Sequence, residues 1–160
     1  MNDKQKEFQR VFEFVVKHNG GNIPWKNQIT KKLIRWALFY KKIFIVYDGP
    51  RIAALAFAWR TSHPENSYED LSLDKTESGD FLHVYRVIVH PEYRKQGLMF
   101  MLLVMGLLRF RGVKTVFWEK RSRNGKTQLV IESTQRVLDE LAKWQKIKSN
   151  QNLLKSKLKV

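Results

Sequence analysis

The segment with the most chemical information is residues 90–99, which read HPEYRKQGLM. The residues before it favour a strand and those after it favour a helix, so its last N–H groups lie at a helix N-terminus without intrahelical partners. The helix dipole adds about half a positive charge there. Arg94 and Lys95 add two cationic side chains, and Gly97 allows a ligand to approach the backbone closely. This combination predicts a phosphate-binding site; the alternative is a short glycine loop that only joins two elements.

Three further residues are candidates for acid–base chemistry. His83 and Tyr85 share one face of an expected strand, because side chains alternate along a strand, and Val87 and Val89 continue that face. Glu119 ends another expected strand. An imidazole or a carboxylate beside a reacting amine could relay a proton through water. The alternatives are that His83 is a packed strand residue and that Glu119 is an ion-pair partner of its basic neighbours.

The chain is strongly basic. Its 30 Lys+Arg and 15 Asp+Glu give a net charge of +15 and a pI near 10.1. The charge is segregated, with net values of +8 in residues 1–60, −5 in 61–92 and +12 in 93–160. Such a field concentrates polyanions, of which nucleic acid is the most obvious. An acidic protein, an acidic membrane surface, an anionic cofactor or simple solubility are alternatives. The candidate nucleic-acid contacts are Lys31, Lys32, Arg35, Lys120, Arg121, Arg123 and Lys126.

These residues must be positioned by secondary structure, and the hydrophobic periodicity predicts it. Helices are expected at 3–18, 27–41, 98–110 and 128–148, and strands at 43–47, 51–60, 81–90 and 113–118. The apolar stripe of the last helix consists of Val130, Val137, Leu141 and Trp144. The acidic stretch 61–80 has no periodicity and predicts a long loop, and KRSRNGK at 120–126 predicts a basic turn. Strand, helix and strand across 81–118 form a βαβ unit, which makes two strands parallel. The fold class is therefore α/β (α+β), with a mixed sheet of at least four strands.

Composition limits the remaining possibilities. A length of 160 residues predicts a single domain, at 1–148, with a basic flexible tail at 149–160. The absence of cysteine excludes disulfides, thiolate catalysis and Cys-ligated metal sites. The four histidines lack metal-ligand spacing, so we expect no metal site. No apolar run is long enough for a membrane span, and the first residues carry no signal-peptide core, so we expect a cytoplasmic protein.

The segment VIVHPEYRKQGLMFMLL resembles the acetyl-coenzyme A motif of the GCN5-related N-acetyltransferases (GNAT), and the resemblance extends over about residues 43–118. It implies a GNAT-like, mostly antiparallel sheet with a central parallel βαβ unit flanked by helices. It implies that amides from Gln96 to about Phe100 hold a pyrophosphate and that the backbone of Val87 and Val89 pairs with a pantetheine arm. The implied cofactor-binding residues are Val87, Val89, Arg94, Lys95, Gln96, Gly97, Leu98, Met99 and Phe100.

The chain also departs from that family pattern. Met99 stands where the motif has a small residue, and no tyrosine follows Tyr93 to serve as the family's general acid. The C-terminal part is atypical and is more similar to phage-associated or toxin-activating acyltransferases.

The resemblance predicts an N-acyltransferase that uses acetyl-CoA or another acyl-CoA. The net charge points to an acceptor amine on a macromolecule, either a nucleic acid or a protein associated with nucleic acid. The main alternative is a non-catalytic GNAT-fold protein that binds nucleic acid or belongs to a virion. A third possibility, acylation of acidic small molecules or polyamines, fits less well for polyamines because a basic surface repels them.

Overall fold

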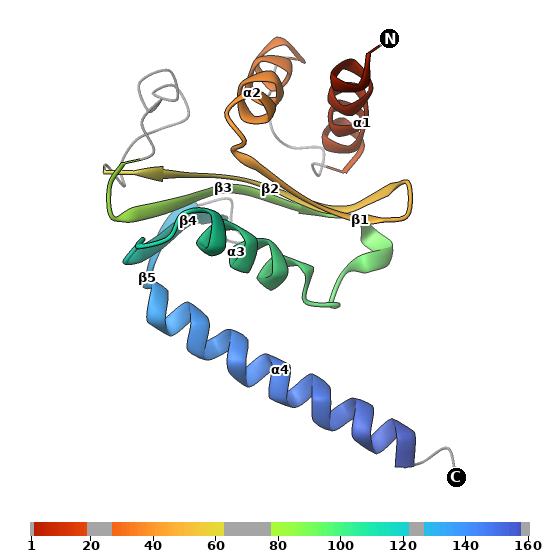
Figure 1. Cartoon of the computed structure of the whole chain (residues 1–160), viewed down its shortest axis with the longest axis vertical. Coiled ribbons are helices and arrows are strands. Elements are labelled where there is room, and N and C mark those ends of the chain that lie inside the picture. The colour runs from red at the N-terminus through yellow and green to blue at the C-terminus, as the bar shows by residue number, and fades with distance from the viewer. Residues whose placement is uncertain (1, 19–26, 63–77, 122–126, 158–160) are drawn as a thin grey trace.

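The computed structural model describes residues 2–18, 27–62, 78–121 and 127–157. Its centre is a five-stranded sheet in the order β1-β2-β3-β4-β5 (Figure 1). The strands are β1 Ile43–Asp48, β2 Arg51–Thr61, β3 Phe81–Val89, β4 Thr115–Arg121 and β5 Thr127–Ser133. Only β3 and β4 pair in parallel, and helix α3, Leu98–Arg109, connects them. The fold class expected from the sequence, a mostly antiparallel mixed sheet with a central βαβ unit, is confirmed.

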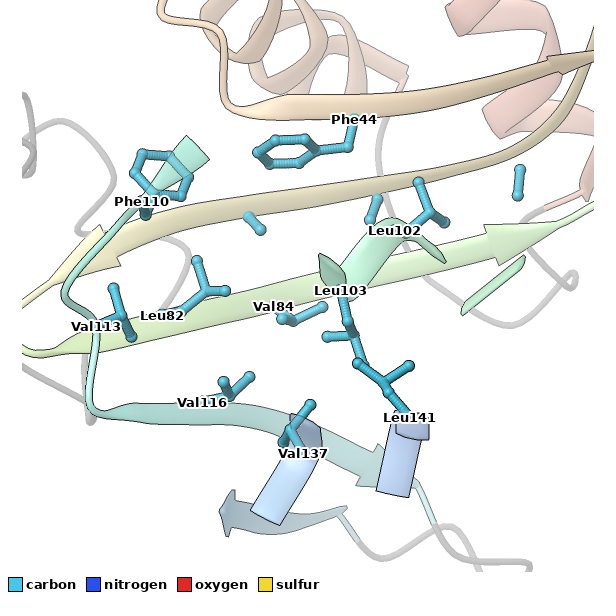
Figure 2. Packing of buried hydrophobic residues seen from close by; sticks show 13 residues of the cluster. Phe44, Leu82, Val84, Leu102, Leu103, Phe110, Val113, Val116, Val137 and Leu141 are labelled. Carbon is cyan, nitrogen blue, oxygen red and sulfur yellow. The ribbon is translucent and has the colours of Figure 1, made fainter. Parts of the chain in front are cut away.

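Helices cover both faces of the sheet. Helices α1, Asp3–His18, and α2, Asn27–Phe39, lie on one face, and α3 lies on the other (Figure 1). The first layer is filled by residues such as Val11, Leu33, Leu55 and Phe57. The second layer is shown in Figure 2, where Leu103 of α3 and Leu141 of the last helix point toward each other. No helix in the described part of the chain is long and apolar enough to cross a membrane.

The last helix, α4, begins later than the sequence predicted. Residues 127–133 form strand β5, which pairs antiparallel with β4, and α4 spans Thr134–Lys157. The helix prediction from 128 was wrong because antiparallel pairing with β4 satisfies the backbone of this β-branched segment. Val137 and Leu141, predicted on the helix stripe, are buried as expected, while Val130 lies in the strand. Helix α4 also continues beyond 148, and in Figure 1 it extends away from the sheet.

Strand β3 contains an irregularity that changes which side chains share a face. Phe57 and Ala58 of β2 are adjacent, but they pair with Arg86 and Val84, so Tyr85 is an extra residue on β3. A bulge of this kind reverses the alternation of side chains. The prediction that Val87 and Val89 continue the face of His83 was therefore wrong. Val87 and Val89 pack in the layer beneath α3, whereas Tyr85 packs in the layer of α1 and α2.

Candidate cofactor-binding site

The loop between β3 and α3 is held in place by backbone hydrogen bonds. The N–H of His90 donates to the carbonyl of Ala53 on β2 at 2.9 Å. A short 3-10 turn, Pro91–Tyr93, follows, and His90 Nδ1 accepts a hydrogen bond from the N–H of Glu92 at 3.3 Å. Helix α3 then begins after Gly97, whose φ of 80° is in the left-handed region. The predicted strand–loop–helix segment is thus present, and the N-terminus of α3 opens toward the loop.

Side chains also link the loop to the turn between β1 and β2. The Tyr93 hydroxyl donates to Asp48 Oδ2, and this hydrogen bond is the main reason why the pKa of Tyr93 is raised. Arg51 Nη1 lies 3.5 Å from Glu92 Oε2, with both side chains exposed. An exposed ion pair contributes little stability. Together these contacts fix the orientation of the loop relative to the sheet.

A pocket of about 270 Å³ lies between this loop, the end of β3, the first turn of α3 and helix α4. None of the described residues that line it is acidic, and Arg94 and Lys95 provide two exposed cations. The charge of the pocket therefore favours an anionic ligand. The lining residues are Val89, Tyr93, Arg94, Lys95, Gly97, Leu98, Met99, Phe100 and Trp144.

Seven of the nine predicted cofactor-binding residues line this pocket. The other two are Val87, which lies further back on β3, and Gln96, whose side-chain amide donates to the carbonyl of Glu92 at 3.1 Å. Two lining residues, Tyr93 and Trp144, were not predicted as cofactor-binding residues. The signal for Trp144 was its place on the apolar stripe of the last helix, which indicated burial but not the partner.

The two parallel strands separate beside the pocket. Their pairing comprises four residue pairs, from Phe81–Thr115 to Val84–Trp118. Beyond these pairs β3 continues to Val89, still paired with β2, while β4 continues to Arg121, paired with β5. Two of the predicted catalytic residues, Tyr85 and Glu119, directly follow the last parallel pair. The side chain of Glu119 lies outside the described part of the structure.

His83, the third predicted catalytic residue, is enclosed by aromatic rings. Its imidazole stacks on Phe117 with a centroid distance of 4.3 Å, and Trp59 contacts it edge-on at 4.8 Å. It is 5% exposed, and burial lowers its pKa from 6.5 to about 4. Among the described residues, Nδ1 has no hydrogen-bond partner. His83 is therefore neutral at physiological pH and packs in the layer opposite α3.

The predicted nucleic-acid contacts do not form one cluster. Lys31, Lys32 and Arg35 are exposed on α2, on the sheet face opposite the pocket, and Lys31 and Arg35 lie over aromatic rings of α1. Lys120 and Arg121 belong to β4 rather than to a turn, which corrects the predicted basic turn at its start. Arg123 and Lys126 lie outside the described residues.

Metal binding has no support in the described residues, where no three His, Asp or Glu side chains gather in a suitable arrangement.

The sequence matches a known family over residues 14–128, described as the "Acetyltransferase (GNAT) family". The chain belongs to the acetyltransferase (GNAT) family. This membership confirms the resemblance found in the sequence. The match ends near the start of β5, so α4 with Trp144 lies outside it.

Solved GNAT structures share this fold at low sequence identity. The loading GNATL domain of CurA from Lyngbya majuscula is 21% identical, with a TM-score of 0.58, over 74% of this chain and 62% of that one. The GphF GNAT-like decarboxylase in complex with isobutyryl-CoA is 17% identical, with a TM-score of 0.57, over 72% of this chain and 62% of that one. The polyamine N-acetyltransferase of Drosophila melanogaster is 20% identical, with a TM-score of 0.54, over 86% of this chain and 78% of that one.

The chain thus spans less than two thirds of the first two GNAT structures, and these identities show a shared fold only. No curated protein matches the sequence closely enough to count as a relative.

Proposed function

We propose that this GNAT protein transfers an acyl group from acyl-CoA to an amine on a macromolecule. The observation that supports this most is the coincidence of two features at one end of the sheet. The pocket with Arg94 and Lys95 lies at the end of β3, and β3 separates from β4 within five residues of that end. The cationic loop suits the cofactor diphosphate, and the separated edge of β3 suits an extended chain with amide groups.

The transfer requires few functional groups. The acceptor nitrogen attacks the thioester carbonyl, a C–N bond forms, the C–S bond breaks, and the released thiolate takes up a proton. A base must accept the proton of the amine. His83, Tyr85 and Glu119 remain the candidates, since they lie at or directly beside the point of separation. With a pKa of about 4, His83 is a weak base, so its use needs an acceptor complex that stabilises the imidazolium.

Charge supports a polyanionic acceptor or an acceptor bound to a polyanion. The net charge is +15, and three exposed cations, Lys31, Lys32 and Arg35, lie on α2. A small polycation such as a polyamine is repelled by such a field, whereas nucleic acid is attracted. We therefore infer an amine on a nucleic acid, or on a protein that is bound to one, as the acceptor.

The absence of cysteine makes the activity simple to measure, because a thiol-reactive dye detects only released coenzyme A. The protein is mixed with acetyl-CoA and, separately, with a single-stranded oligonucleotide, a lysine-rich protein bound to the same oligonucleotide, or spermidine. We expect release of coenzyme A with the oligonucleotide or with the protein–oligonucleotide mixture, and we expect the rate of release to fall as the salt concentration rises. Release with spermidine alone would contradict the macromolecular acceptor. Oligonucleotide binding with no release from any mixture would favour the non-catalytic alternative.

Charge-reversal variants locate the acceptor surface. The triple variant Lys31→Glu, Lys32→Glu, Arg35→Glu should lower oligonucleotide-dependent release while acetyl-CoA binding is unchanged, since α2 lies across the sheet from the pocket. A matched triple on α4, Arg136→Glu, Lys143→Glu, Lys146→Glu, changes the net charge equally. If both variants lose the same fraction of oligonucleotide-dependent release, the net charge of the protein, and not the α2 surface, controls the use of the acceptor.

A further inference from the structure

The loop glycine that a phosphate would approach is already covered by a side chain of this chain. A Cβ built on Gly97 would lie 2.0 Å from Cη2 and 2.2 Å from Cζ2 of Trp144. These distances are far below any contact between real atoms, so the indole ring lies directly on the bare Cα of Gly97. The ring also contacts Phe100 in the first turn of α3, with a centroid distance of 5.9 Å. The positive φ favours glycine at 97, and the absence of a Cβ leaves room for this ring.

The ring reaches the loop because α4 lies against the second layer of the core. Val137 and Leu141 are buried there, and Trp144 follows Leu141 by three residues, on the same side of the helix. Toward its C-terminal end, α4 extends away from the sheet (Figure 1). Val137, Leu141 and Trp144 thus form one row along α4, and the residue that covers the loop is the last described residue of this row.

The space that remains beside the ring is smaller than an acyl-CoA. The pocket measures about 270 Å³. Pockets that bury drug-sized ligands measure roughly 300–1,000 Å³, and coenzyme A is larger than most such ligands. The ring over Gly97 thus takes up space beside the N-terminus of α3, where the diphosphate would lie. The other walls belong to the sheet, to α3 and to the tethered loop, which leaves Trp144 as the movable wall among the described residues.

We propose that Trp144 is a displaceable cover of the cofactor site, so that the docked ring and the cofactor diphosphate exclude each other. This inference rests on the proposed function, because it assumes that the pocket takes acyl-CoA. When only a fraction of the protein is in the form that can bind, the apparent Kd equals the intrinsic Kd divided by that fraction. Removal of the ring should then tighten binding. If the ring instead stacks on the bound cofactor as a permanent wall, its removal should weaken binding.

The test is a calorimetric titration of acetyl-CoA into the full chain and into two variants. Trp144→Ala removes the cover, and Leu138→Ala, an exposed residue on the same helix, is the matched control. We expect Trp144→Ala to bind about tenfold more tightly than wild type, a change of about 1.4 kcal/mol, and Leu138→Ala to bind like wild type. Thermal unfolding of each variant confirms that the fold is retained.

The outcomes separate this inference from the proposed function. Binding by wild type with equal or weaker binding by Trp144→Ala overturns the cover and leaves the cofactor site intact. No binding by any of the three overturns the cofactor site and the cover together. Binding by Trp144→Ala alone supports both.

A second measurement follows the ring itself. The emission of Trp144, obtained as the difference between wild type and Trp144→Phe, should become more accessible to iodide when acetyl-CoA binds. Reduced accessibility in the complex would contradict displacement.

Discussion

Burial of His83 makes a specific prediction about stability and pH. Its imidazole lies between Phe117 and Trp59, and burial lowers its pKa from 6.5 to about 4. In the unfolded chain the imidazole regains its ordinary pKa of about 6.5. The unfolded state therefore binds a proton that the folded state does not bind, and stability decreases as the pH falls through this window. His83→Phe removes the titration and retains an aromatic ring that can stack on Phe117.

The magnitude follows from the two pKa values. Between about pH 7.5 and about pH 5 the unfolded state takes up nearly one proton at His83 and the folded state takes up almost none, which costs about 2 kcal/mol of stability. Carboxyl groups contribute equally to wild type and variant, so the difference between the two proteins isolates the imidazole.

Urea denaturation at both pH values measures this difference. The free energy of unfolding of wild type should fall by about 2 kcal/mol more than that of His83→Phe on acidification. Between about pH 7.5 and about pH 9, where His83 stays neutral in both states, the two proteins should change in parallel. Equal acid dependence of the two proteins would refute the reasoning, because it would mean that His83 titrates normally in the folded chain.

Two further predictions compare matched sites. Gly79→Ala places a Cβ 2.2 Å from the backbone oxygen of Thr61 at a φ of 104°, whereas Gly49→Ala, at a φ of 57°, meets nothing within 4 Å. Thermal unfolding should show a loss of about 1–2 kcal/mol for Gly49→Ala and a clearly larger loss for Gly79→Ala; similar losses would refute the close approach. Leu141→Ala, at a site 7% exposed, should cost about 2–5 kcal/mol, and Leu138→Ala, at 41% exposed, about 0.5 kcal/mol or less, measured by urea denaturation. Equal costs would show that α4 is not anchored through Leu141.

The elements up to residue 118 were predictable because each carries a local hydrophobic period. The segment 127–133 was not, because Leu129, Val130 and Ile131 fit a strand and a helix stripe equally well over so short a run. The Asn124-Gly125 dipeptide before it is the strongest short-range hairpin signal and should have favoured a strand. The deciding interaction, pairing with β4, is not local.

The bulge at Tyr85 was not predictable from the sequence, because it depends on pairing with another strand. Alternation along β3 predicted one face for His83, Tyr85, Val87 and Val89, and the extra residue is visible only from the register with β2. The consequence for the site is considerable, because it moves Val87 and Val89 to the layer of α3, where the predicted cofactor loop lies.

The loop itself was predictable because its signals are adjacent in the sequence: a strand, two cations, a glycine and an apolar helix. The cover of this loop by Trp144 was not predictable. Trp144 and Gly97 are distant along the chain, and they meet only because α4 docks against the core. The apolar stripe of Val137, Leu141 and Trp144 indicated a buried face of the helix. It did not indicate which residue Trp144 contacts.

The most direct test of the cofactor site is calorimetric titration of acetyl-CoA into nucleic-acid-free protein, with Arg94→Glu and Lys4→Glu compared. Arg94 lines the pocket, while Lys4 is exposed on α1 across the sheet, and both variants change the net charge equally. Gly97→Glu should also abolish binding, but its side chain would collide with Trp144, so charge reversal at Arg94 is the cleaner change. We expect micromolar, stoichiometric binding by wild type and Lys4→Glu and a large loss with Arg94→Glu. Equal binding by all three proteins, or no binding by wild type and by Trp144→Ala alike, would contradict the cofactor site.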